Sequence, residues 1–380
     1  MIVKTPPMGW NTWNTFGTNI DETLVMQVAD VLVSEGYKDA GYEYVVIDDC
    51  WSQHTRDENG RLVADPVKFP HGMKYLADYI HGKGLKFGMY SCAGFETCAG
   101  YPSSYGYEFV DADTFASWGV DFLKYDFCYF PKTGDGKLAY ITMSNALRTC
   151  GRDILFSACN WGTDECWEWM NSTGAHMYRS TGDIFDNFES IKNIFLSQAD
   201  KFNRSGPGCF NDIDMLVCGM YGKGNVGVGS PCGDTEYKTH FALWCLASSP
   251  LMIGGDVRNM SDYCHKLLTN PRLIAINQDP DARAPFEILT NYWNSGTMRR
   301  YVKMLADGDY IVGVFNFGDH ECSVCVYEQE LGFPVNSGRK LQLSDVFTGE
   351  DLGVMKDAYR VKLPAHDCAM IRIHVTRKAQ

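Results

Sequence analysis

Short apolar runs alternate with helical patterns along the first 280 residues of the chain. The runs predict strands, and two of them, Tyr44–Asp49 and Phe122–Asp126, end abruptly on aspartate. Between the runs, apolar residues recur at helical spacing, as over Asp21–Glu35, which begins with two acids and is followed by Gly36. The predicted strands are Met8–Trp13, Tyr44–Asp49, Leu85–Tyr90, Phe122–Asp126, Ile154–Trp161, Met177–Arg179, Cys209–Leu216 and Leu251–Gly255.

Eight such β/α units predict an α/β fold with a closed parallel (β/α)8 barrel. A doubly wound open sheet is the alternative, but no Gly-x-Gly-x-x-Gly sequence follows the first strand. Beyond Pro280 the pattern changes to short alternating runs without helices, as in Tyr310–Phe317, Cys322–Tyr327 and Cys368–Val375. We therefore expect a barrel domain over residues 1–280 and a C-terminal antiparallel β-sandwich over residues 281–380.

The composition is that of an ordinary globular protein, with 45% hydrophobic and 21% charged residues among 380. A formal net charge of -13 argues against a nucleic-acid partner, because phosphate-binding surfaces need clustered Lys and Arg. No run approaches the ~18 apolar residues of a membrane span, so we expect no membrane partner either. Whether the chain forms a homo-oligomer stays open.

The N-terminal residues Met1–Pro7 contain no apolar stretch of the kind that marks a signal peptide. We therefore expect a cytoplasmic protein, or a secreted one only if a leader preceded this sequence. The 15 cysteines are an odd number, so they cannot all pair within the chain. Mostly free thiols are usual in a reducing compartment.

Carboxylates that follow several strands of a barrel gather at one rim, where barrel enzymes assemble their active sites. Asp126 ends one strand, and Lys124 lies two residues earlier on the same side, where its ammonium favours the ionised carboxylate. Asp183 follows the strand Met177–Arg179 and suits an acid/base role. One such aspartate more often caps the next helix. Several in barrel order favour hydrolysis of a glycosidic bond, which needs two carboxyl groups.

Asp48 and Asp49 are adjacent, so on a regular strand they would point to opposite faces, whereas at a strand end both can meet a ligand. Ionised carboxylates suit the vicinal hydroxyls of a sugar. A metal site is the competing interpretation, and we expect none because no His cluster or third carboxylate has suitable spacing. Trp13, Tyr90 and Trp161 fall at predicted strand ends and can stack on a pyranose, although each alone is more often a core residue.

Together these residues resemble glycoside hydrolase family 27, the family of α-galactosidases and α-N-acetylgalactosaminidases. The matching motifs run in family order over nearly the whole chain and are Pro7–Trp13, Asp48–Trp51, Lys124–Tyr129, Arg179–Ile184, Gly206–Gly208, Asn211–Leu216 and Ala275–Asp279. The resemblance implies a (β/α)8 barrel followed by an antiparallel β-sandwich. It also implies an enzyme that needs neither a metal nor an organic cofactor.

The same resemblance implies a retaining double displacement. Asp126 would be the nucleophile and Asp183 the acid/base, about 5–5.5 Å apart as in retaining enzymes generally. Cys98 and Cys128 fall where relatives carry a disulfide beside the pocket, and its formation here depends on the compartment.

The sugar contacts are implied by position. Asp48 and Asp49 would hold the 4- and 6-hydroxyls. Lys124 would hold the 3- and 4-hydroxyls, and Arg179 the region of the 2-position. The predicted substrate-binding residues are Trp13, Asp48, Asp49, Tyr90, Lys124, Asn160, Trp161 and Arg179.

One position departs from many galactose-acting relatives, which carry Cys-Glu-Trp at the end of the fifth strand. Here the sequence is Cys-Asn-Trp, and Asn160 can both donate to and accept from a 2-hydroxyl without adding charge. Because Asn160 is not the small residue of an acetamido pocket, we expect hydrolysis of terminal α-D-galactosyl residues from a galactose-containing oligosaccharide or glycan. The alternatives on this scaffold are an α-N-acetylgalactosaminidase and a β-L-arabinopyranosidase. A catalytically inactive galactose-binding protein is the remote alternative.

Overall fold

The computed structural model describes residues 3–289, 296–334 and 336–377. Within the first of these ranges, eight parallel strands lie in the order β7-β6-β5-β4-β3-β2-β1-β8. Their bounds are β1 (Met8–Asn11), β2 (Tyr44–Val46), β3 (Lys86–Cys92), β4 (Phe122–Asp126), β5 (Leu155–Cys159), β6 (Met177–Arg179), β7 (Phe210–Asp212) and β8 (Leu251–Ile253). The backbone of Leu216, beyond β7, bonds to that of Met252 and Gly254 at 2.8 Å each. These bonds close the sheet, which confirms the predicted barrel.

The barrel strands are mostly shorter than the apolar runs that predict them. The run Cys209–Leu216 yields only β7, because Asp214 adopts a left-handed φ of 80° that interrupts the ladder before Leu216. β4 and β6 have the predicted bounds. Both of these strands end on a charged residue, Asp126 and Arg179 respectively, at the carboxyl rim of the barrel.

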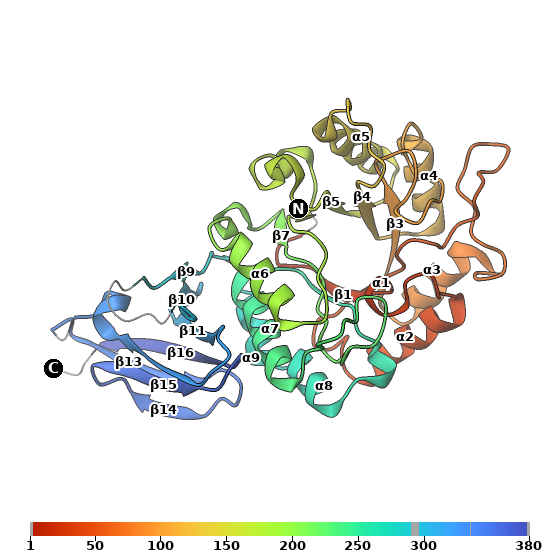
Figure 1. The fold of residues 1–380 in the computed structure, drawn as a ribbon. Helices are drawn as coiled ribbons and strands as arrows, with labels where there is room; N and C mark the ends of the chain where they lie inside the picture. Colours follow the sequence, from red (N-terminus) through yellow and green to blue (C-terminus); the bar gives the residue numbers. More distant parts are fainter. Residues whose placement is uncertain (1–2, 290–295, 335, 378–380) are drawn as a thin grey trace.

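Helices cover the outside of the barrel (Figure 1), except for the short helix after β1, which lies at the mouth. They are α1 (Trp13–Phe16), α2 (Glu22–Ser34), α3 (Gly72–Gly82), α4 (Glu108–Trp118), α5 (Gly136–Thr149), α6 (Phe188–Gln198), α7 (Asp234–Ala247), α8 (Asp262–Leu268) and α9 (Pro271–Asn277), with 3-10 turns η1 (Thr163–Glu168), η2 (Met170–Thr173), η3 (Phe202–Arg204) and η4 (Val257–Asn259). In α2, the Asp21 carboxylate accepts from Leu24 N at 2.7 Å and caps the first turn, while Val25, Val28 and Leu32 are buried. Among the described residues, no helix combines the length and apolar content needed to span a bilayer.

Alternation along the strands builds the barrel interior in layers. One buried apolar cluster contains Tyr44, Phe122, Leu155, Met177, Phe210 and Met252. Because side chains two residues apart on a strand face the same side, Lys124 and Asp126 rise above Phe122 toward the carboxyl rim. In the same way, Arg179 rises above Met177. Apolar residues thus close the depth of the barrel, and charged residues occupy its mouth.

From Phe286 onward, the strands of the described ranges are antiparallel and form two sheets, ordered β14-β13-β16-β11-β10-β9 and β12-β15. Their bounds are β9 (Phe286–Glu287), β10 (Met298–Met304), β11 (Tyr310–Asn316), β12 (Cys322–Tyr327), β13 (Arg339–Asp345), β14 (Asp351–Val354), β15 (Ala358–Leu363) and β16 (Cys368–Arg377), with the turn η5 (Glu328–Leu331). Val312 and Ile371 of one sheet share a buried cluster with Val326 and Leu363 of the other. The predicted β-sandwich is confirmed, and the exact boundary at residue 280 stays a prediction.

The sandwich packs against the barrel through a shared core. Tyr301 of β10 belongs to the same buried cluster as the barrel helices. Two residues further along β10, Lys303 is 0% exposed. Its Nζ donates to the carbonyl oxygens of Leu246 and Ile276 at 3.1 and 3.4 Å and to Ser248 Oγ at 2.5 Å. The ammonium therefore meets the negative carboxyl-terminal ends of α7 and α9.

Candidate active site

The carboxyl ends of the barrel strands surround a cavity of about 160 Å³. Every predicted site residue except Asn160 lines it. These residues are Trp13, Asp48, Asp49, Tyr90, Cys98, Lys124, Asp126, Cys128, Trp161, Arg179 and Asp183. This volume is smaller than the ~300–1,000 Å³ of typical ligand pockets. The cavity therefore suits the terminal unit of a substrate and not a whole oligosaccharide.

Asp126 lies at the end of β4 and is 5% exposed. The Tyr90 hydroxyl donates to its Oδ2 at 3.2 Å, and the Phe127 backbone N–H donates to its Oδ1 at 2.9 Å. Burial, followed by the charge of Asp126, raises the pKa of Tyr90, so the phenol stays a donor. A carboxylate offers about four lone-pair sites, so two donors fix Asp126 and leave acceptor capacity for a substrate.

Lys124 and Asp48 form an ion pair in the wall of the cavity. Lys124 Nζ lies 2.8 Å from Asp48 Oδ2, which also accepts from Asn11 Nδ2 at 2.8 Å. Burial alone would lower the pKa of Lys124, but the carboxylates of Asp48 and Asp126 outweigh it and raise the pKa. An ammonium has three donors, so Lys124 retains donors for sugar hydroxyls.

Asp49 reaches the cavity because the chain turns directly after it. Cys50 has a left-handed φ of 71°, which ends the extended geometry in which neighbours face opposite sides. The Asp49 carboxylate accepts from the backbone N–H of Ala99 at 2.8 Å and of Cys50 at 2.7 Å. Burial raises the pKa of Asp49, and these N–H donors oppose the rise.

Arg179 lies between two carboxylates at the end of β6. Its Nη1 is 2.9 Å from Asp214 Oδ1, and its Nη2 is 3.0 Å from Asp183 Oδ1. The side chain of Asp214 is 3% exposed, whereas that of Asp183 is 61% exposed. One guanidinium thus holds a buried carboxylate in place and contacts a second one that faces solvent.

The pKa values of Asp126 and Asp183 move in opposite directions. Burial raises the pKa of Asp126 to about 6, although Lys124 opposes the rise. Burial also acts to raise the pKa of Asp183, but Arg179 outweighs it and the pKa falls below its ordinary value. Lys124 favours the ionised form of Asp126, as expected, but removing the carboxylate from water has the larger effect.

Asn160 lies outside the cavity lining. Its Nδ2 donates to the Thr163 carbonyl at 3.0 Å, and its Oδ1 is buried without a hydrogen-bond partner among the described residues. Strand alternation accounts for this position. Leu155 and Ser157 face the barrel interior. Asn160 has the opposite parity to these two residues, whereas Trp161 shares their parity and lines the cavity.

Asn14, Asp214 and Val226 also line the cavity, although none was a predicted site residue. Asp214 lies two residues beyond Asp212, the last residue of β7, so strand parity is the signal that could have found it. Asn14 Nδ2 is buried without a hydrogen-bond partner among the described residues and has unmet donor capacity. Val226 comes from the long connection between β7 and α7, where no local pattern marks it.

Cys98 and Cys128 are joined by a disulfide, and both line the cavity. The Tyr90 hydroxyl lies 3.2 Å from Cys98 Sγ, so the bridge packs beside the residue that donates to Asp126.

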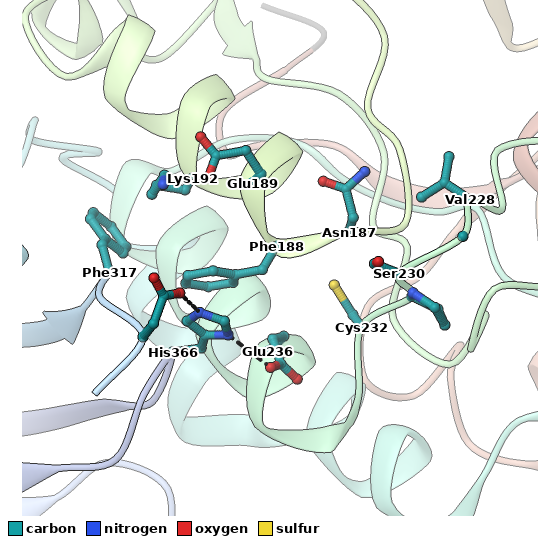
Figure 2. Close-up of a pocket in the computed structure, with 13 residues that line it drawn as sticks. Asn187, Phe188, Glu189, Lys192, Val228, Ser230, Cys232, Glu236, Phe317 and His366 are labelled. Atoms are coloured by element: carbon teal, nitrogen blue, oxygen red, sulfur yellow. Dashed lines mark hydrogen bonds and ion pairs between the residues drawn. The ribbon is translucent and has the colours of Figure 1, made fainter. Parts of the chain in front are cut away.

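A larger cavity of about 710 Å³ lies where the amino ends of α6 and α7 meet the sandwich. Its His366 contacts Glu236 (Nδ1···Oε1 3.0 Å; Figure 2) and also Asp319 (Nε2···Oδ1 3.3 Å). Phe188 stacks on the same imidazole at 4.0 Å between ring centroids. The charged groups here are paired with one another, and none of the predicted site residues is among those described as lining it. The smaller cavity therefore carries the candidate chemistry.

Comparison with known proteins agrees with this geometry. Residues 5–279 match the family model described as alpha galactosidase A, and residues 295–373 match that of the alpha galactosidase C-terminal beta sandwich domain. Alpha-galactosidase A of Cellvibrio japonicus is 40% identical over 395 residues, which cover 98% of this chain and 92% of that protein.

Two solved structures bear on the sugar that the site accepts. The α-galactosidase of Saccharomyces cerevisiae, solved with raffinose, superposes with a TM-score of 0.89 and 30% identity over 98% of both chains. A family 27 β-L-arabinopyranosidase of Geobacillus stearothermophilus, solved with arabinose, has a TM-score of 0.87 and 25% identity, and covers 98% of this chain and 97% of that one.

Proposed function

The chain belongs to glycoside hydrolase family 27, the α-galactosidase family, and we propose that it hydrolyses terminal α-D-galactosyl residues with retention through a covalent glycosyl-enzyme. One observation carries the proposal. Asp126 and Asp183 line the same cavity, the first 5% exposed and the second with its side chain 61% exposed. A buried carboxylate suits a nucleophile beneath the sugar, and a solvent-facing one suits an acid/base that must reach both aglycone and water.

In the first step, an Asp126 oxygen attacks the anomeric carbon and forms an ester to it. The bond to the glycosidic oxygen breaks, and that oxygen takes a proton from Asp183 and leaves as an alcohol. Asp183 must therefore be protonated at this point. A substrate that replaces the water around Asp183 and loosens its 3.0 Å contact with Arg179 raises its pKa, because burial then outweighs the guanidinium.

In the second step, Asp183 acts as a base. Its carboxylate takes a proton from water, the water oxygen attacks the anomeric carbon, and the ester bond to Asp126 breaks. Galactose leaves with its original configuration, and Asp126 returns to the carboxylate form. With a pKa of about 6, Asp126 is largely ionised at neutral pH, so it is ready to attack the next substrate.

Recognition of the sugar rests on groups whose hydrogen bonds are incompletely used. Asp48 and Asp49 would accept from the 4- and 6-hydroxyls, and Lys124 would donate to the 3- and 4-hydroxyls. Arabinopyranose lacks the carbon that carries the 6-hydroxyl, so it would leave Asp49 without that partner. A site built to bind a hydroxyl rejects analogues that lack it by up to ~10⁴-fold.

Initial rates on matched p-nitrophenyl α-D-galactoside, α-N-acetylgalactosaminide and β-L-arabinopyranoside test the proposal. We expect the α-galactoside to dominate, and NMR to detect α-galactose as the first-formed anomer. Dominant turnover of the arabinopyranoside would instead support the activity of the Geobacillus relative. First formation of β-galactose would rule out the retaining mechanism.

A further inference from the structure

Three aromatic side chains, Phe95, Tyr105 and Tyr129, are 60%, 41% and 60% exposed. They come from two loops that follow β3 and β4, and we call them the aromatic rim. Single exposed aromatic residues are common on protein surfaces and need no explanation. These three differ because their loops are fixed against one another and against the catalytic cavity.

Backbone packing holds the rim in place. A Cβ at Gly94 would lie 1.9 Å from the Cys128 carbonyl oxygen, so only glycine permits this approach of the two loops. Phe95 N donates to the Tyr129 carbonyl at 3.3 Å, and the Phe95 and Tyr105 rings pack edge to face with centroids 4.7 Å apart. Tyr129 itself has a left-handed φ of 51°, a conformation that bulky residues rarely adopt. Such strained positions concentrate at functional sites.

The rim adjoins the cavity directly. Cys98 and Cys128, the two halves of the disulfide, line the cavity. Tyr129 follows Cys128, so their Cα atoms are only ~3.8 Å apart. Phe95 precedes Cys98 by three residues in the other loop. Phe95 and Tyr129 therefore belong to the two segments that the disulfide joins beside the cavity.

We propose that the aromatic rim binds the aglycone sugars of an oligosaccharide substrate. The inference rests on the proposed function. Because a cavity of about 160 Å³ suits only the terminal unit of a substrate, the remaining sugars must lie outside it. The rim offers uncharged aromatic faces, which suit the apolar C–H faces of neutral sugars. It thereby favours oligosaccharides over galactosides with a minimal aglycone.

The test compares kcat/KM for raffinose with kcat/KM for methyl α-D-galactoside, whose aglycone is a single methyl group. The variant is Phe95→Ala with Tyr129→Gly, glycine being chosen because it accepts the left-handed φ. We expect the raffinose-to-methyl ratio to fall about tenfold, mainly through KM, which corresponds to the loss of roughly one stacking contact. The matched control is Phe286→Ala, a 68% exposed phenylalanine of β9, which should keep the wild-type ratio.

Phe185→Ala is a second arm, because this 46% exposed residue lies two positions beyond Asp183. If Phe185→Ala lowers the ratio and the rim variant does not, the aglycone leaves on the acid/base side and the inference is wrong. An unchanged ratio in the rim variant overturns it as well. Failure of the wild type to hydrolyse either galactoside would instead refute the proposed function, and the inference with it.

Discussion

Two of the regions that hold buried charges are the catalytic cavity and the junction between barrel and sandwich. At the junction, the ammonium of Lys303 has three N–H donors and three acceptors within hydrogen-bond distance, so its capacity is fully used. In the cavity, Asn14 Nδ2 and Arg179 Nε are buried with no partner among the described residues, and Asp126 keeps acceptor capacity. The difference teaches that burial alone does not indicate function. Open hydrogen-bonding capacity indicates function only where it faces a cavity that a ligand can enter, because the Tyr301 hydroxyl at the junction is also buried with no partner among the described residues.

The volume of a cavity is a poorer guide to function than the open hydrogen-bonding capacity of the residues that line it. The cavity in Figure 2 is more than four times larger than the catalytic one, at about 710 against about 160 Å³. Its imidazole is already held by two carboxylates and a phenyl ring. A change at the cavity should therefore remove chemistry with little effect on folding, and a change at the junction should do the reverse.

The largest effect is expected from Asp126→Asn. The amide keeps the shape, and its one oxygen can still accept from Phe127 N, but an NH2 group replaces the oxygen that accepts from Tyr90, and the amide cannot form the glycosyl ester. We expect kcat to fall by about 10⁴-fold or more, as when an enzyme loses its nucleophile. Initial rates on p-nitrophenyl α-D-galactoside measure the loss. The melting temperature should not fall, because burial raises the pKa of Asp126 and so its charge is costly to bury. Residual activity above a few per cent would remove Asp126 from the nucleophile role.

Asp183→Asn should cost about 10³-fold in kcat on raffinose, within the range for general acid–base catalysis. On p-nitrophenyl α-D-galactoside the rate of the first step should fall much less, because nitrophenolate leaves without a proton. A rapid burst of nitrophenol followed by slow turnover would show that the second step, which needs the base, has become limiting. Equal losses on both substrates with no burst would contradict the acid/base role.

The strands could be predicted from short apolar runs. The charged mouth could be predicted because side chains alternate between the two faces of a strand. β4 matches its predicted bounds, and the parity of Lys124 and Asp126 places both above Phe122. On the fifth strand Asn160 has the other parity and lies outside the cavity lining, whereas on the seventh Asp214 shares the parity of Asp212 and lines the cavity. Position along a motif and position along a strand therefore carry different information.

Other features lie beyond local patterns. The run Cys209–Leu216 reads as one strand, and only the left-handed φ of Asp214 divides it. The sandwich order, in which β16 lies between β13 and β11, depends on pairings between distant segments. Val226 lines the cavity from a loop whose path is set by tertiary contacts. One of these is the hydrogen bond from Asp186 N to the Val226 carbonyl oxygen at 3.1 Å. The pKa of Asp126 depends on its burial, which the sequence does not state.

Lys303→Met tests the other half of the comparison. Methionine fills similar space but leaves two buried carbonyls and the Ser248 hydroxyl without their donor. Burial lowers the pKa of Lys303 to about 8, so removing the costly buried charge offsets part of this penalty, and we expect a loss of about 1.4 kcal/mol in unfolding free energy. This is a factor of ~10 in the folding equilibrium. Urea unfolding of the whole chain measures it, and kcat of the folded enzyme should stay at the wild-type value. Lys340→Met, at an exposed position of β13, is the control and should change stability by less than ~0.5 kcal/mol. If folded Lys303→Met lost activity, the junction would also contribute to catalysis, and the contrast between the two regions would be wrong.

The smallest effect expected is a shift in the acid limb of the pH–rate profile. This shift tests whether the charge of Lys124 opposes the effect of burial on Asp126. The reactive form of Asp126 is the carboxylate, and burial raises its pKa to about 6. Activity on p-nitrophenyl α-D-galactoside, whose leaving group needs no proton from Asp183, is therefore lost as the pH falls, with kcat/KM declining about tenfold per unit below that value. Lys124→Met removes the charge that opposes burial, so the acid limb should move to higher pH, whatever the absolute loss of activity. Lys74→Met, with the same change of charge at a side chain that is 60% exposed on α3, should leave the limb in place. Rates from about pH 4 to about pH 8 decide the matter. A limb near pH 4 in the wild type, or one that stays fixed in Lys124→Met, would mean that another group controls the first step.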